Sequence, residues 1–165
     1  MAALATGTKA PEFELKTLDG KAFSLSAELA RGAVVLAFFK VSCPTCQYAF
    51  PFLERLHKAY GGKGVALVGV SQNSAKDTAA FNKEFGITFP VLLDDTSSYP
   101  VSNAYGLTNV PTVFWIAQDH EIEVSSVGWV KAEFEEINRR MAEAGKVAPA
   151  AVFKPGESVR DFQAG

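Results

Sequence analysis

Residues 33–46, with the sequence AVVLAFFKVSCPTC, decide the fold. The first part, Ala33–Phe39, is a short continuous apolar run rich in β-branched and aromatic residues, which predicts a strand buried on both faces of a sheet. Over Pro44–Tyr60 apolar residues recur at helical spacing, and two glycines then end the pattern. The two cysteines of the chain, Cys43 and Cys46, are therefore predicted to lie at a strand-to-helix turn.

The position of the two cysteines favours a dithiol that opens and closes. At the first turn of a helix, free backbone N–H groups and the helix dipole favour an anion, which predicts a reactive thiolate at Cys43. Cys46 follows one helical turn later on the same face, so it is the natural resolving thiol. Pro44 suits the first helical turn, where an N–H would have no partner.

A cysteine pair at this spacing has two other uses, a structural zinc site and an inert pair of thiols. A structural zinc ion needs four ligands, and beyond the cysteines the chain offers only His57 and His120, with no second cysteine pair. An inert pair of buried thiols is the other alternative. The sequence favours redox chemistry over both, with no metal and no organic cofactor.

Further motifs carry a resemblance to a known family. A proline, Pro51, follows the second cysteine by five residues, and residues 109–112, Asn-Val-Pro-Thr, precede another apolar stretch. With the cysteine motif, these features resemble the thioredoxin-like proteins over about residues 9–144. The chain is most similar to their redoxin branch, often labelled alkyl-hydroperoxide-reductase and thiol-specific-antioxidant. The resemblance implies an α/β fold, with a mixed β-sheet flanked by helices and an N-terminal β-hairpin.

The resemblance also implies roles for particular residues. Pro111 corresponds to the cis proline of the fold, and Val110 before it would offer its backbone to an extended substrate beside the attacking sulfur. Pro44 and Thr45, between the cysteines, would belong to the same substrate-binding surface. The implied activity is thiol-disulfide exchange with a protein disulfide or dithiol, as part of cell redox homeostasis. Lys40 could add positive charge near the thiolate; the alternative is an ordinary exposed lysine.

Two positions depart from the family pattern. Ala37 stands where thioredoxins carry a buried Asp that helps to move the proton of the resolving thiol, so that proton must pass to water or to another side chain. Ser42 replaces the tryptophan that usually precedes the first cysteine. The packing of a substrate over the site is therefore expected to differ from that in thioredoxins.

A peroxiredoxin-like thiol peroxidase is the main rival function. Its motif places a Pro seven residues, and a Thr or Ser three residues, before the reactive cysteine. For Cys43 these places hold Leu36 and Lys40, and Cys46 fits no better. No arginine occurs in residues 56–138, where one would polarise the peroxide. A non-catalytic binding module on the same fold is the second rival.

Composition and charge bound the remaining possibilities. The 165 residues are 48% hydrophobic and include thirteen Phe, enough for one compact core without disulfide staples. A formal net charge of -2 favours neither a nucleic-acid partner nor an anionic membrane. No stretch approaches ~20 apolar residues, so no membrane span is expected. The N-terminus lacks the basic start of a signal peptide, which predicts a cytoplasmic protein. An exported form whose signal has been removed stays open.

The chain divides into a redox domain, residues 1–146, and a C-terminal tail, residues 147–165. In the domain, Asp19-Gly20 predicts the turn of a hairpin, and Ser74 and Gly86 are predicted to start and end a helix. Strands are expected at residues 65–71, 112–116 and 122–127, a possible sheet edge at 89–94, and helices at 98–105 and 131–144. In the tail, Phe153, Val159 and Phe162 could anchor an otherwise irregular extension; the alternative is a disordered end.

Overall fold

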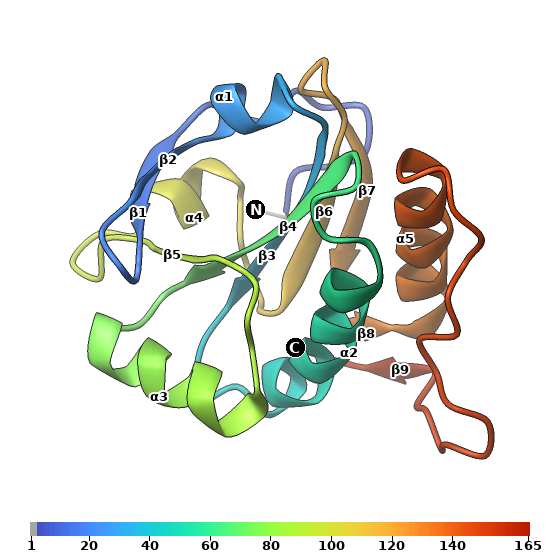
Figure 1. Ribbon diagram of the computed structural model, residues 1–165. Coiled ribbons are helices and arrows are strands. Elements are labelled where there is room, and N and C mark those ends of the chain that lie inside the picture. The colour runs from blue at the N-terminus through green and yellow to red at the C-terminus, as the bar shows by residue number, and fades with distance from the viewer. Residues whose placement is uncertain (1–2) are drawn as a thin grey trace.

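A seven-stranded mixed sheet lies between two layers of helices (Figure 1) in the computed structural model, which describes residues 3–165. The strand order is β2-β1-β5-β4-β3-β6-β7, and β8 and β9 form a separate two-stranded ladder. The strands are β1 (Glu14–Thr17), β2 (Ala22–Ser24), β3 (Ala33–Phe39), β4 (Val65–Ser71), β5 (Val91–Leu93), β6 (Thr112–Ile116), β7 (Ile122–Val127), β8 (Trp129–Val130) and β9 (Phe162–Gln163). The helices are α1 (Leu25–Leu29), α2 (Pro44–Tyr60), α3 (Ala75–Phe85), α4 (Pro100–Ala104) and α5 (Lys131–Ala144).

The central strand β3 is buried on both faces, as its apolar run predicts. It pairs with β4 in parallel and with β6 in antiparallel orientation along nearly its whole length. Because successive side chains of a strand point to opposite faces, β3 contributes to two separate cores. Its odd-numbered residues from Val35 to Phe39 enter one core, and its even-numbered residues from Val34 to Phe38 enter the other.

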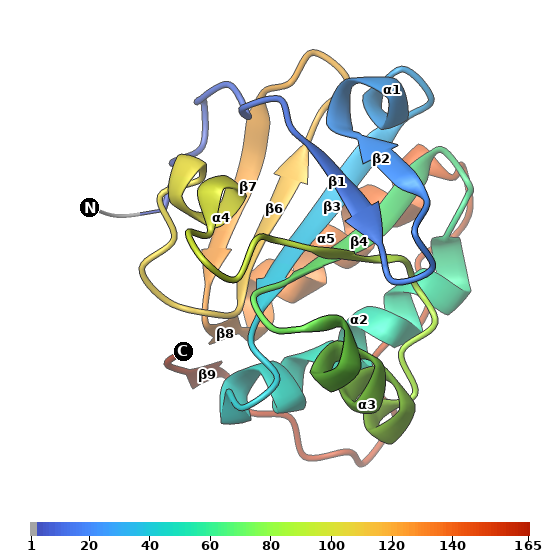
Figure 2. The ribbon, with the colours of Figure 1, turned by 90° about the vertical axis from the view of Figure 1, so that its left-hand side faces the viewer.

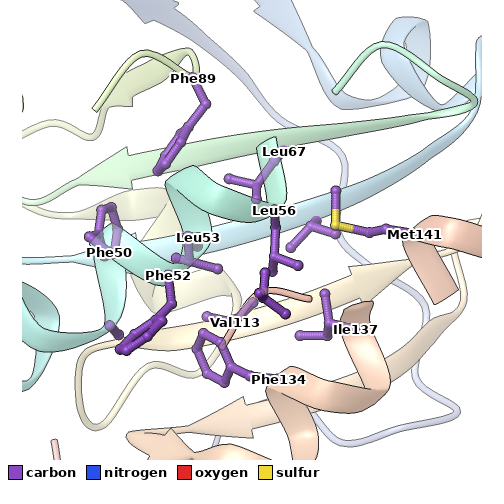
Figure 3. Close-up of a cluster of buried hydrophobic side chains, with 14 of the residues drawn as sticks. Phe50, Phe52, Leu53, Leu56, Leu67, Phe89, Val113, Phe134, Ile137 and Met141 are labelled. Carbon is purple, nitrogen blue, oxygen red and sulfur yellow. The ribbon is translucent and has the colours of Figure 1, made fainter. Parts of the chain in front are cut away.

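Helices cover both faces of the sheet. Figure 2 shows α4 in front of the sheet and α5 behind it. The larger core lies under α2 and α5, where Leu53 and Leu56 meet Ile137 and Met141 (Figure 3). The second core packs Leu25 and other α1 residues against the opposite face. The βαβ unit of β3, α2 and β4 therefore places the start of α2 at the end of a rigid strand.

Several predicted elements are confirmed at their ends. Helix α3 begins after Ser74, whose hydroxyl accepts the N–H of Asp77 at 3.2 Å, and ends at Gly86 in the left-handed conformation with φ of 67°. Helix α2 begins at Pro44 and contains Pro51, as expected. No helix in residues 3–165 has the length and apolarity needed to cross a membrane.

The structure corrects one prediction and adds elements that the sequence pattern did not indicate. Strand β5 does not lie at the sheet edge, because the N-terminal hairpin adds outside it and pairs Lys16 with Leu93. The short helix α1 was not predicted; Ser24 caps it by accepting the N–H of Ala27. The ladder of β8 and β9 was not predicted either, and it joins the tail to the domain.

Leu53, at the centre of α2 and fully buried, tests the importance of the larger core. We expect Leu53→Ala to lower the free energy of unfolding by about 2–5 kcal/mol, because the substitution removes apolar contacts and leaves a cavity. Urea denaturation followed by circular dichroism measures this change. Lys58→Ala, at an exposed position of the same helix, is the control and should change stability by less than about 0.5 kcal/mol.

Candidate active site

The cysteine motif lies where β3 hands over to α2. Cys43 is the N-cap residue of α2, and its sulfur accepts the backbone N–H of Cys46 at 3.1 Å. The loop before it is held by its own hydrogen bonds, including one from the Cys43 N–H to the Lys40 carbonyl at 3.3 Å. A sulfur that accepts a backbone N–H at a helix start is in a place that favours negative charge.

The loop before β6 meets the same sulfur. The Val110–Pro111 peptide bond is cis, as the resemblance implies. The Cys43 thiol donates to the carbonyl oxygen of Val110 at 3.3 Å. The structure thus brings Cys43 and Val110, which lie 67 residues apart in the sequence, into direct contact.

The two cysteines differ in their surroundings. Cys43 is half-buried, whereas Cys46 is fully buried in the larger core. Burial, and after it the side chain of Cys43, raises the pKa of the Cys46 thiol far above its usual range. Cys46 is therefore a protonated thiol at neutral pH, shielded from solvent, while Cys43 is open to approach.

The other predicted site residues lie around this pair in different ways. Lys40 and Pro44 are exposed, and Pro44 occupies the first turn of α2. Thr45 is only 4% exposed, and its hydroxyl donates to the carbonyl of Ala164 at 2.6 Å and accepts from the Gln163 side-chain amide at 2.8 Å. The tail therefore already occupies the polar group of Thr45.

The tail is a part of the site that sequence reasoning missed. Gly165 lies against the Val110 carbonyl, so closely that a Cβ on Gly165 would overlap this oxygen. The Asn109 side-chain amide donates to the Gly165 carbonyl at 3.4 Å. The only sequence signal for docking of the tail was its apolar residues. Phe153 and Val159 do pack on the larger core, with Phe153 5.3 Å from Phe52 between ring centroids, but the Phe162 side chain is 63% exposed and packs on no core.

Groups able to hold a metal are dispersed. Within residues 3–165, no cluster of three or more His, Cys, Asp or Glu side chains could bind an ion. His57 lies in α2 beside Phe89, with ring centroids 6.0 Å apart, and His120 lies in the turn between β6 and β7.

Comparison with known proteins agrees with this arrangement. Residues 6–125 match the family described as AhpC/TSA family. The chain belongs to the AhpC/TSA family. Among relatives of this AhpC/TSA protein, the thiol-disulfide oxidoreductase ResA of Geobacillus thermodenitrificans (strain NG80-2) is 31% identical over 132 residues, which cover 79% of this chain and 74% of the relative.

Solved structures show the same fold as this AhpC/TSA protein. A crystal structure titled as a putative thiol:disulfide interchange protein DsbE from Chlorobium tepidum is 26% identical, with a TM-score of 0.74 over 86% of this chain and 99% of the other. The thioredoxin domain of a thiol-disulfide oxidoreductase from Bacteroides vulgatus is 20% identical, with a TM-score of 0.75 over 84% of this chain and 99% of that domain. The predicted thioredoxin-like fold and redoxin family are confirmed.

The contrast between the cysteines predicts their reactivity. In the reduced protein at pH 7, we expect iodoacetamide to modify Cys43 and to leave Cys46 largely unmodified, because burial and a raised pKa keep Cys46 neutral and covered. Mass spectrometry of the intact protein and of its peptides measures the sites of alkylation. In guanidinium chloride both should react at similar rates; preferential modification of Cys46 in the native protein would contradict the assignment.

An ion pair that fixes the tail predicts a pH effect. Arg55 donates two hydrogen bonds of 2.8 Å to the Glu157 carboxylate. These bonds, with the Lys154 N–H, lower the pKa of Glu157 from 4.5 to about 2. Because the folded pKa is depressed, the stabilisation is complete above about pH 4.5 and is lost as the pH falls through about 2.

We therefore expect Glu157→Gln to lower the melting temperature at pH 6, and the difference from the unaltered chain to shrink as the pH falls from 4.5 towards 2. Differential scanning calorimetry at several pH values measures this difference. Glu84→Gln, at an exposed position in α3 that forms no ion pair within residues 3–165, is the control and should show no such difference at pH 6.

Proposed function

We propose that Cys43 attacks the disulfide of a partner protein and that Cys46 resolves the mixed disulfide. The chain is a thiol-disulfide oxidoreductase: relatives with this name match most of its length, and the two cysteines stand at the place that the fold provides for them. What we propose in addition is the role of each cysteine, with Cys43 as the attacking and Cys46 as the resolving thiol.

The position of the Cys43 sulfur supports its role as the attacking thiol. A single sulfur, that of Cys43, lies between the N–H of Cys46 and the carbonyl of Val110, at 3.1 and 3.3 Å. It is the more exposed of the two sulfurs, and the N–H bond stabilises negative charge on it. Its leaving-group and attacking roles both need that charge.

The reaction proceeds in two exchanges. In the first, the Cys43 thiolate attacks one sulfur of the partner disulfide; a bond forms between Cys43 and that sulfur, and the second partner sulfur leaves as a thiolate that takes up a proton. In the second, Cys46 loses its proton and attacks the Cys43 sulfur, which forms the Cys43–Cys46 disulfide and releases the first partner sulfur. Two electrons have then passed from the dithiol to the partner.

The raised pKa of Cys46 gives the second exchange a requirement. A proton must leave a fully buried thiol, and Ala37, which is buried in β3, provides no carboxylate to take it. In the mixed disulfide the Cys43 sulfur carries no charge, so a negative charge on Cys43 no longer raises the pKa of Cys46. Attachment of the partner thus promotes its own release.

The proposed partner is a protein disulfide, oriented by the backbone of the loop before β6. The Val110 carbonyl accepts the Cys43 thiol, and once that thiol has reacted, the carbonyl can pair with an extended chain. Contributions of Pro111, Pro44 and Thr45 to substrate binding remain predictions, as do an electrostatic effect of Lys40 on the thiolate and a cytoplasmic location.

Two serine variants test the roles. We expect Cys43→Ser to abolish dithiol-dependent reduction of insulin, because it removes the attacking thiolate. Cys46→Ser should keep the first exchange and accumulate a mixed disulfide with the partner, because nothing resolves it. Turbidity of reduced insulin measures the rate, and non-reducing electrophoresis with mass spectrometry identifies the adduct.

The rival functions predict other outcomes. A peroxidase would consume hydrogen peroxide far faster than glutathione does. If Cys43→Ser lost this peroxide consumption but kept insulin reduction, the result would favour a peroxidase. A binding module would reduce insulin no faster than dithiothreitol does by itself. Insulin reduction retained in Cys43→Ser contradicts the proposed attack by Cys43.

A further inference from the structure

Residues 162–165 run across the mouth of the site. The strand β9 pairs antiparallel with β8, with Gln163 opposite Trp129. Beyond it, the Ala164 carbonyl accepts the hydroxyl of Thr45 at 2.6 Å. The tail is thus held between the β8 backbone on one side and the first turn of α2 on the other.

The end of this segment fits closely against two backbones. Gly165 touches the Val110 carbonyl so closely that a side chain at this place would overlap it. On the other side, Gly128 approaches the tail, since a Cβ there would lie 2.8 Å from the Gln163 carbonyl oxygen and 3.1 Å from the Gly165 nitrogen. Because Gly128 and Gly165 carry no side chain, the extended tail fits between Thr45, Val110 and Gly128. The space between these three residues is called the groove.

The tail contacts the same atom that the attacking sulfur contacts. The Val110 carbonyl oxygen accepts the thiol of Cys43, and it is also the atom that a Cβ on Gly165 would overlap. Addition of an extended chain to a free strand edge is a common mode of peptide recognition, in which main-chain bonds provide affinity. The tail is likewise an extended chain: it pairs with β8 through its backbone, and its end lies against the Val110 carbonyl, the group that the proposed function assigns to the substrate.

The rest of the tail is anchored independently of this segment. The Trp129 indole donates to the Arg160 carbonyl at 2.6 Å, and the Arg160 N–H donates to the Tyr48 hydroxyl at 3.0 Å. Further back, the pair of Arg55 and Glu157 holds the chain. Residues 162–165 can consequently leave the groove while the tail up to Arg160 stays in place.

We infer that residues 162–165 are an internal competitor of the substrate: they occupy the groove beside Cys43 as an extended polypeptide would, and a protein substrate must displace them. This inference rests on the proposed function, because it assigns the groove to the partner chain. The short tether holds the segment at an effective concentration on the order of millimolar, so it competes with substrates in free solution.

The inference implies a selectivity by substrate size. Cys43 is half-buried with the segment in place. A small disulfide has no flanking backbone that must bind in the groove, so it can still reach this sulfur. A disulfide within a polypeptide needs the groove for its flanking backbone. Removal of the segment should therefore accelerate the second class of substrate and not the first.

A chain that ends at Asp161 tests this selectivity. It keeps the bond from the Lys131 N–H to the Asp161 carbonyl and the bond of Trp129 to Arg160. We expect kcat/KM for insulin reduction to rise about tenfold. This is the gain expected if the segment leaves the groove open in about one molecule in ten of the unaltered chain. The rate with hydroxyethyl disulfide should stay within about twofold of the original.

A point variant of full length separates displacement from loss of chain. Gly165→Val keeps every residue but places a side chain against the Val110 carbonyl, so it should give the same selective gain. Ser158→Val introduces the same residue at an exposed place in the tail outside the groove, and should leave both rates unchanged. Thermal unfolding of each variant checks that the domain is intact.

The outcomes are distinct. A selective gain with insulin in both the shortened chain and Gly165→Val supports the inference. An unchanged or lower rate with insulin in the shortened, folded chain overturns it and makes the tail a fixed wall of the site. Equal gains with both substrates also overturn it. Absence of insulin reduction in every form, the unaltered chain included, would instead contradict the proposed function.

Discussion

Burial of β3 on both faces is the constraint on which the rest of the structure depends. Its side chains supply the centre of two cores, so the strand has no freedom to shift its register without exposing one of them. Cys43 follows this strand after a three-residue loop and caps the helix that packs on the same sheet. The position of the sulfur is therefore set by the hydrophobic cores, and the redox site needs no separate scaffold.

The asymmetry of the two cysteines comes from the same packing. Helix α2 buries one side against the sheet, and Cys46 lies on that side, one turn from the exposed helix start. A relative named as a thiol-disulfide oxidoreductase matches most of the chain in sequence, and a solved thioredoxin domain shares its fold. The chemistry thus follows from where a strand ends and a helix begins.

The sequence predicted the elements around Cys43 with the observed bounds because their signals are local. A continuous apolar run marks β3, and Pro44 and the glycines after Tyr60 mark the ends of α2. The position of β5 was missed because a three-residue strand has no pattern that says which neighbours it pairs with. The contact of Cys43 with Val110 could be predicted only from the family resemblance, since no local signal in the sequence joins residues so far apart.

The tail was the least predictable part of the site. Its contacts with Thr45 and Val110 use backbone atoms and the absence of a side chain at Gly165, and neither leaves a hydrophobic period in the sequence. The apolar residues of the tail suggested anchors, of which Phe153 packs on the domain and Phe162 does not. Docking of this kind becomes visible only when distant backbones are placed together.

The complete burial of Cys46 has a consequence for the timing of exchange. Small thiols in solution cannot reach the fully buried Cys46 sulfur, so they can act on a mixed disulfide of Cys43 only by attacking the mixed disulfide itself. Under the proposed roles, the rate at which Cys46 resolves the mixed disulfide depends on the departure of one proton from a fully buried thiol. The packing of the larger core around Cys46 therefore sets the lifetime of the intermediate wherever small thiols are scarce.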